Sequence, residues 1–135
     1  MSRHPEVAVG AIVTHAEQLL LVQRGRGSGA GRWAIPSGRV ELGETLAEAV
    51  TRELHEETGL QGVCGRFVGW AEILDDHLHA VVLDFEVDLL EFAEPVAGDD
   101  ACDARWVPLG DVASMDLVPG MAEFLAEHRF IDTIV

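Results

Sequence analysis

Residues 45–58 carry the signals of a helix with defined ends, and they restrict the possible folds more than any other segment. Thr45 followed by Glu48 fits a capping box, and Gly59 stands where a helix often ends in a left-handed glycine. Apolar residues recur at every fourth position, as in a helix that packs one face against a core. These residues are Leu46, Val50 and Leu54. We therefore predict an amphipathic helix from Thr45 to Thr58.

The same helix places glutamates on one face. Glu53, Glu56 and Glu57 have the spacing i, i+3 and i+4, which brings like charges together at a cost of a few tenths of a kcal/mol per pair. They also lie near the helix C-terminus, where negative charge opposes the helix dipole. Hard divalent cations such as Mg²⁺ bind carboxylate oxygens, often together with substrate phosphates. The arrangement predicts a metal-dependent site for phosphate chemistry.

The net charge restricts the class of partner. The chain has 24 acidic and 9 basic residues, all of the latter arginine, for a net charge of −15. Such a protein repels nucleic-acid backbones and anionic membrane surfaces, so we expect neither as a partner. A small phosphorylated substrate is also repelled unless a bound cation reverses the local charge.

Length and apolar content indicate a single domain over residues 1–135. The chain is 48% hydrophobic, which suffices for a core, but its apolar runs are shorter than the ~20 residues that span a bilayer. The N-terminal sequence lacks a secretory signal pattern, so we expect a cytoplasmic protein. Cys64 and Cys102 either form one disulfide or, as that location favours, stay reduced.

Strand patterns outnumber helix patterns. The strands are expected at Glu6–Thr14, Gln18–Gln23, Trp33–Pro36, Val63–Ile73, His79–Leu90 and Ala104–Pro108, and a second helix at Val118–Arg129. The first two strands are expected to form a hairpin. His79–Leu90 alternates, with apolar side chains opposite Asp84, Glu86 and Asp88, as in a half-buried antiparallel strand. We predict an α/β fold, an α/β/α sandwich with a mixed, mostly antiparallel sheet.

The central segment matches a longer motif than amphipathicity requires. It fits G-x5-E-x7-R-E-U-x-E-E-x-G-U, where U is a bulky apolar residue, through Gly38, Glu44, Arg52, Glu53, Glu56, Glu57 and Gly59. This pattern resembles the Nudix box at every defined position. The flanking segments WAIP and ARWVPLGDV are similar to the same family, so the resemblance covers nearly the whole chain.

The resemblance implies hydrolysis of a nucleoside diphosphate linked to another group, with Mg²⁺ or Mn²⁺. Glu56 and Glu57 would be the main metal ligands, Glu53 a further ligand or the general base, and the Gly38 carbonyl an additional ligand. Glu44 would support the metal shell and Arg52 would orient the glutamates. Ser37 departs from the glycine that is usual there, which is expected to change the loop geometry slightly.

Several residues outside the box are weaker candidates for substrate binding. A glycine-rich, cationic loop is flanked by Arg24, Arg26 and Arg32. These arginines either contact the phosphates of a substrate or have no role in binding it. Asp99 and Asp100 form either a further acidic site or a solvated turn. His77 either reaches the substrate or faces solvent.

The segment at residues 95–112 bears on the substrate. It contains P-x-A-G-D-D-A-x-x-x-x-W, which is similar to the ADP-ribose pyrophosphatases of the family and implies cleavage to AMP and ribose 5-phosphate. Residues 74–77 lack the proline usual in those enzymes. A nucleoside triphosphate pyrophosphohydrolase is the alternative, and a non-catalytic nucleotide-binding domain is a third. The family resemblance also implies a possible homodimer.

Overall fold

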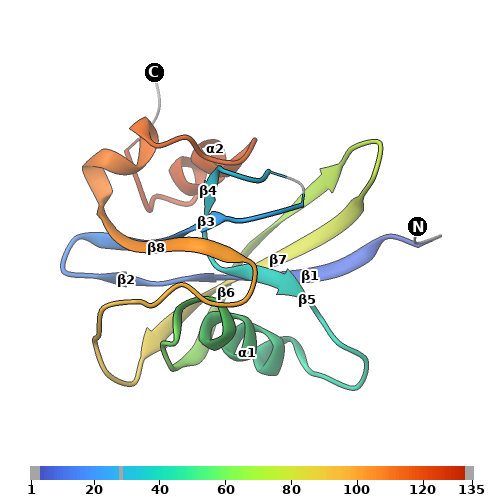
Figure 1. The fold of residues 1–135 in the computed structure, drawn as a ribbon, viewed down its shortest axis with the longest axis horizontal. Helices are drawn as coiled ribbons and strands as arrows, with labels where there is room; N and C mark the ends of the chain where they lie inside the picture. Colours follow the sequence, from blue (N-terminus) through green and yellow to red (C-terminus); the bar gives the residue numbers. More distant parts are fainter. Residues whose placement is uncertain (1–3, 28, 133–135) are drawn as a thin grey trace.

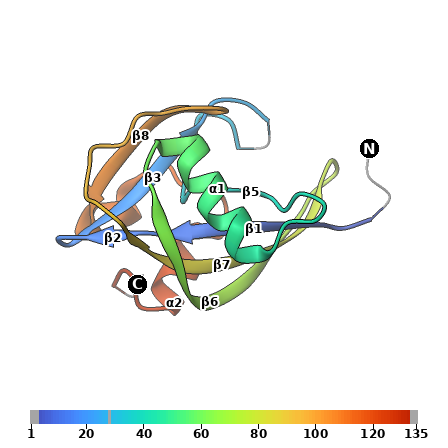
Figure 2. The same ribbon diagram turned by 90° about the horizontal axis from the view of Figure 1, so that it is seen from below.

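The computed structural model of the protein describes residues 4–27 and 29–132, and it places two four-stranded sheets between two helices (Figure 1). Residues 1–3, part of the segment inspected above for a secretory signal, and Ser28 of the glycine-rich loop lie outside the described residues. Figures 1 and 2 show helices α1 and α2 on opposite sides of the sheets. The predicted α/β class, with helices outside the sheet layer, is confirmed. In the described part of the chain, no helix is long and apolar enough to cross a membrane.

The first sheet has the order β5-β1-β7-β6. Its strands are β5 (Ser37–Arg39), β1 (Glu6–Ile12), β7 (His79–Leu89) and β6 (Gly62–Leu74). The β1–β7 pair is parallel, whereas β1–β5 and β6–β7 are antiparallel. The prediction that residues 79–90 form a purely antiparallel strand was therefore wrong, because alternation reports which faces are buried and not the direction of a neighbour.

The second sheet is built around β3 (Gln18–Arg24), which pairs with β2 (Thr14–His15), β4 (Trp33–Ala34) and β8 (Ala101–Pro108). The expected N-terminal hairpin is correct for β2 and β3 only, since β1 belongs to the other sheet. Strand β8 begins at Ala101, three residues earlier than the predicted residue 104. Pro36 separates β4 from β5, and each of these belongs to a different sheet.

Helix α1 (Leu46–Thr58) has the predicted ends. The Thr45 side chain accepts from the Glu48 backbone, the Glu48 side chain accepts from the Thr45 backbone, and Gly59 has φ 75°. Helix α2 (Met121–Glu127) is shorter than the predicted 118–129. It starts after Gly120, which has φ 84°, a left-handed conformation that a continuous helix cannot contain. A 3₁₀ helix, η1 (Leu109–Ser114), was not predicted.

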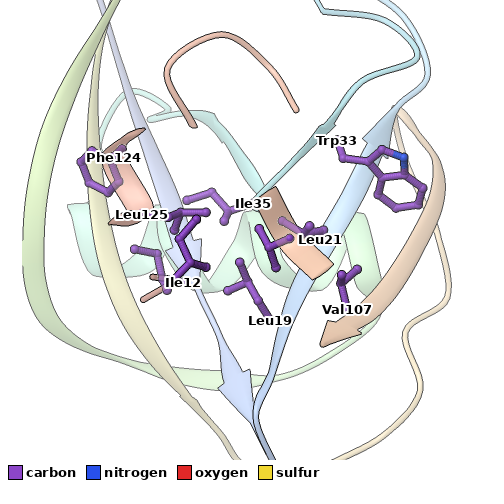
Figure 3. Packing of buried hydrophobic residues seen from close by; sticks show 10 residues of the cluster. Ile12, Leu19, Leu21, Trp33, Ile35, Val107, Phe124 and Leu125 are labelled. Atoms are coloured by element: carbon purple, nitrogen blue, oxygen red, sulfur yellow. The ribbon is translucent and has the colours of Figure 1, made fainter. Parts of the chain in front are cut away.

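Two apolar clusters cover the two faces of the first sheet. One lies between the sheets and α2 and includes Ile12, Ile35 and Leu125 (Figure 3). The other lies under α1 and includes Val9, Val50 and Leu54. The predicted stripe of α1 is therefore correct for Val50 and Leu54, whereas Leu46 in the first turn is 36% exposed. The acidic face of the helix is left to reach the edge strand β5.

The face of β7 that carries Asp84 is turned away from α1, toward Ile35. Odd-numbered residues of β7 pack in the α1 cluster, as their common face predicts. Asp84 on the other face is not half-exposed but buried, with 4% of its surface accessible. Alternation separated the two faces correctly but did not show that the polar face is covered at Asp84.

Candidate active site

Arg52 connects the glutamates of the box. Its Nε donates to Glu44 at 2.6 Å and its Nη1 to Glu53 at 2.7 Å and to Glu56 at 3.2 Å. Its Nη2 donates to the Arg39 carbonyl at 2.9 Å, which ties α1 to the end of β5. The hydrogen bond from Arg52 lowers the pKa of Glu44 to about 2. Arg52 therefore has the geometry to orient the acidic side chains, as the resemblance implies.

Glu53 and Glu57 lie side by side where α1 meets β5. Glu57 Oε1 accepts from the Ser37 N–H at 3.2 Å. Burial, followed by the neighbouring charge of Glu53, raises the pKa of Glu57 to about 8. Burial also raises the pKa of Glu53, against the opposing effect of Arg52. Two carboxyl groups that resist ionisation together indicate a position where an added cation is stabilising.

Gly38 provides the space for Glu53. A Cβ at this position would lie 2.2 Å from the Glu53 carboxyl carbon and 2.3 Å from both of its oxygens. Real contacts of this kind do not occur, so any side chain at residue 38 must displace the carboxylate. The glycine of the motif is thus required for close approach, independently of any role of its carbonyl.

We expect Gly38→Ala to reduce kcat by about 10²-fold with a smaller change in KM, because a 1 Å displacement of a catalytic group has an effect of that size. Steady-state kinetics with the cognate substrate measures this change. Gly43→Ala is the matched control, since nothing lies within 4 Å of its added Cβ. Its φ of 85° strains the loop, so it reports the effect of backbone strain alone. Equal losses in the two variants would contradict the steric explanation.

A cavity of about 750 Å³ opens beside these carboxylates, which is a size typical of ligand sites. The predicted site residues among its lining are Arg24, Arg26, Gly38, Glu53, Glu57, Asp99 and Asp100. They come from β3 and the loop after it, from β5, from α1 and from the loop before β8. The structure thus brings together groups from four separate parts of the sequence.

The two loops at the cavity mouth contact each other. The Arg26 side chain forms an ion pair with Asp100, and the Gly25 N–H donates to the Asp100 carbonyl at 2.8 Å. The charge of Arg24 partly offsets the rise in the pKa of Glu57 that burial causes, so a positive group lies near the acidic pair. The cavity therefore has cationic side chains on one side and carboxylates on the other. This arrangement suits a phosphate group that contacts the arginines directly and the carboxylates through a cation.

Other predicted residues lie outside this lining. Glu56 is directed to Arg52, with 40% of its side chain exposed. Arg32 lies 3.8 Å from Asp116, and the backbone of His77 donates to Asp75 in the turn between β6 and β7. Arg52 and Glu44 do not line the cavity and contact its carboxylates or each other instead. Gly59 ends α1.

The donor set of the cavity fits a hard divalent cation. In residues 4–27 and 29–132, no three His, Cys, Asp or Glu side chains converge as a complete metal cluster. The cavity nevertheless contains two carboxylates whose ionised forms are destabilised by burial, and Glu56 lies one turn away on the same helix as Glu53. Backbone carbonyls and substrate oxygens commonly complete such sites. The residues present therefore suit Mg²⁺ or Mn²⁺.

Two contributors, and the burial of an acid near the site, were not predicted from the sequence. The Ser37 N–H and the Arg39 carbonyl act through the backbone, so no residue type marks them. Asp84 is buried two residues beyond Val82 of the cavity lining on the same strand, and it does not line the cavity itself. Its position opposite Gly10 is a matter of strand register, for which a single sequence carries no signal.

Comparisons with known proteins agree with this geometry. The family model of the NUDIX domain matches residues 4–128. An ADP-ribose pyrophosphatase of Methanocaldococcus jannaschii is 36% identical over 114 residues, covering 83% of this chain and 67% of that protein. An oxidized purine nucleoside triphosphate hydrolase of Mus musculus is 32% identical over 120 residues, covering 73% and 74%.

Among solved structures, the MutT protein of Methanosarcina mazei Go1 superimposes with a TM-score of 0.83 at 25% identity, over 96% of both chains. The family assignment rests on the match along the chain and agrees with the motif of the acidic helix and the cavity beside it. The protein belongs to the Nudix family and is a hydrolase acting on nucleotide pyrophosphate bonds.

Proposed function

We propose that the protein is a Mg²⁺-dependent pyrophosphatase that cleaves ADP-ribose to AMP and ribose 5-phosphate. The observation that carries this proposal is the pairing of Glu53 and Glu57 in a cavity that Arg24 and Arg26 also line. The M. jannaschii relative, which is named an ADP-ribose pyrophosphatase, supports the choice of substrate. So does the acidic segment at residues 95–112, which brings Asp99 and Asp100 to the cavity.

The basic and the acidic residues of the cavity have different roles. Arg24 and Arg26 bind the oxygens of the diphosphate at the cavity mouth. Glu53 and Glu57, with Glu56 and the Gly38 carbonyl, would hold a divalent cation. When bound, a divalent cation neutralises phosphate charge and lowers the pKa of a water molecule.

A carboxylate of the same group accepts the proton of the attacking water. Glu53 and Glu57 both line the cavity and so are the two candidates for this role. Arg52 holds Glu53 and Glu44 in place and does not line the cavity. Its contribution is therefore to position the carboxylates.

A second function is favoured by one comparison. The Mus musculus relative is named an oxidized purine nucleoside triphosphate hydrolase, and the same carboxylates and arginines suit a triphosphate. The two reactions differ in product, since a triphosphate pyrophosphohydrolase releases pyrophosphate and a nucleoside monophosphate.

A substrate panel separates these functions. With Mg²⁺, we expect ADP-ribose to yield AMP and ribose 5-phosphate, with kcat/KM at least about tenfold above that for any nucleoside triphosphate, NADH or dinucleoside polyphosphate. Chromatography identifies the products. Removing the metal with a chelator is expected to abolish turnover, and Mg²⁺ or Mn²⁺ to restore it. Release of pyrophosphate from a triphosphate, with ADP-ribose left intact, would establish the alternative instead.

A further inference from the structure

The segment at residues 96–101 contacts two parts of the site at once. Its first half covers the C-terminal end of α1, the helix that carries the paired glutamates. The Val96 N–H donates to the Thr58 carbonyl at 2.9 Å, and the Gly98 N–H donates to the Glu57 carbonyl at 3.1 Å. Because the last carbonyls of a helix have no partners within the helix, these two hydrogen bonds fix the segment against the end of α1.

Gly98 allows this contact because it has no side chain. A Cβ at residue 98 would lie 2.6 Å from the carbonyl oxygen of Glu56, a distance at which the backbone of one element or the other must move. The segment therefore lies as close to α1 as its backbone permits. The position of the residues that follow Gly98 is thus set by the end of the helix.

The second half of the segment contacts the loop after β3. The Gly25 N–H donates to the Asp100 carbonyl at 2.8 Å, and a Cβ on Gly25 would lie 2.6 Å from that oxygen. The Asp100 carboxylate accepts from Arg26 Nε at 2.6 Å and forms an ion pair with Arg26 Nη2. Asp100 therefore holds this loop through its backbone and its side chain.

The contact with Asp100 restricts the orientation of the Arg26 side chain. A guanidinium has five N–H donors in a fixed plane, and the edge formed by Nε and Nη2 faces Asp100. The side chain of Arg26 is 79% exposed, so packing restrains its rotamers little. Ordering such a side chain when a ligand binds is unfavourable. An ion pair that already selects its orientation reduces this cost.

We propose that Asp100 is a positioning residue that orients Arg26 toward the phosphates of the substrate, from a place fixed by the end of α1. The inference rests on the proposed function, in which Arg26 binds the diphosphate. Arg26 and Asp100 both line the cavity. Because the Asp100 carboxylate contacts Arg26, we assign it neither to the cation nor to the attacking water.

The effect of removing the Asp100 carboxylate distinguishes this role from the others. On charge alone, the loss of an acid from the mouth of the cavity strengthens the binding of an anion, and so does the loss of a competitor for Arg26. A positioning role predicts the opposite, weaker binding. A ligand of the cation or an acceptor of the proton predicts a loss of kcat instead.

Binding of α,β-methylene-ADP, a diphosphate whose bridge is not hydrolysed, tests the proposal by calorimetric titration with Mg²⁺ present. We expect Asp100→Ala to weaken binding about three- to tenfold. Arg26→Gln should weaken it at least as much, and adding Asp100→Ala to that variant should then have no further effect. In turnover of ADP-ribose, Asp100→Ala should raise KM by the same factor and leave kcat within about twofold.

Asp103→Ala is the matched control. Asp103 also forms an ion pair with an arginine, Arg105 of the same strand, but it does not line the cavity. This variant should bind the probe as the wild-type protein does. The side chains of Arg26 and Asp100 are both more than half exposed, so their variants are expected to fold.

Several outcomes would overturn the inference. These are unchanged or tighter binding by Asp100→Ala, additive effects of the two substitutions, a loss of kcat of about tenfold or more, and a wild-type protein that does not bind the probe. Binding of the probe does not require turnover. The expected binding series without cleavage of ADP-ribose would therefore keep this inference and refute the proposed reaction, whereas cleavage of ADP-ribose with unchanged binding by Asp100→Ala would do the reverse.

Discussion

Glu57→Gln is expected to lower kcat by about 10³-fold or more while the protein remains folded. Glu57 lines the cavity, accepts from the Ser37 N–H and has a pKa raised to about 8 by burial and by the charge of Glu53. A neutral amide keeps the shape and loses the negative charge that binds a cation, and removal of such a group has effects of this order. Steady-state kinetics with Mg²⁺ measures the loss.

The unfolding temperature distinguishes a lost site from a lost fold. Without metal and above pH 8, Glu57→Gln should unfold at the same temperature as the wild-type protein or a higher one, because the variant removes a buried charge beside Glu53. Added Mg²⁺ should raise the unfolding temperature of the wild type and not that of the variant. Glu56→Gln is expected to lose turnover in the same way.

Glu123→Gln, an exposed acid on α2, is the control for a general effect of charge. It should retain full activity and the full response to Mg²⁺. Full activity in both Glu56→Gln and Glu57→Gln would refute the assignment of the metal site.

The sequence predicted the acidic helix in detail because all its determinants are local. The capping box, the apolar stripe and the terminal glycine lie within fifteen positions of one another, and each acts over one or two turns. The structure reproduces both ends of α1 at the expected residues. The contact of Arg52 with Glu56 follows from the same spacing, since the two residues are one turn apart.

The division into two sheets could not be predicted in the same way. Strand β1 is apolar from Val7 onward, and both of its faces are covered from Ala8 to Ile12. Such a run does not identify its neighbours. Strand β5 has only three residues, Ser37–Arg39, with little strand propensity. Its pairing with β1 is a non-local contact that brings Gly38 to Glu53. The register between β1 and β5 therefore determines the approach of Gly38 to Glu53, which the motif does not describe.

Strand pairing also determines which of the candidate residues outside the box reach the cavity. Arg24 and Arg26 reach the cavity because β3 ends beside the loop that carries Asp100. Arg32 lies in the same glycine-rich segment yet contacts Asp116 instead. Composition alone identifies a cationic loop, but the pairing of β3 with β8 determines which of its side chains face the carboxylates.

Asp84→Asn is expected to stabilise the protein at pH 8 and to have little effect at pH 4. Burial raises the pKa of Asp84 from its usual 3.8 to about 7. Between these values the native state holds a proton that the unfolded chain has lost, so stability falls as the pH rises from about 4 to about 7. Above pH 7 both states are ionised and the loss is complete, at about 1.4 kcal/mol per pKa unit.

Asparagine has no charge to bury, so its advantage over aspartate should grow by about 3–4 kcal/mol between pH 4 and pH 8. Denaturant unfolding of both proteins across this range gives the difference, in which the titration of all other groups cancels. Asp88→Asn, on the exposed part of the same strand, should show no such trend. A difference independent of pH would mean that Asp84 is ionised in the native state, with a buried cation or water molecules compensating its charge.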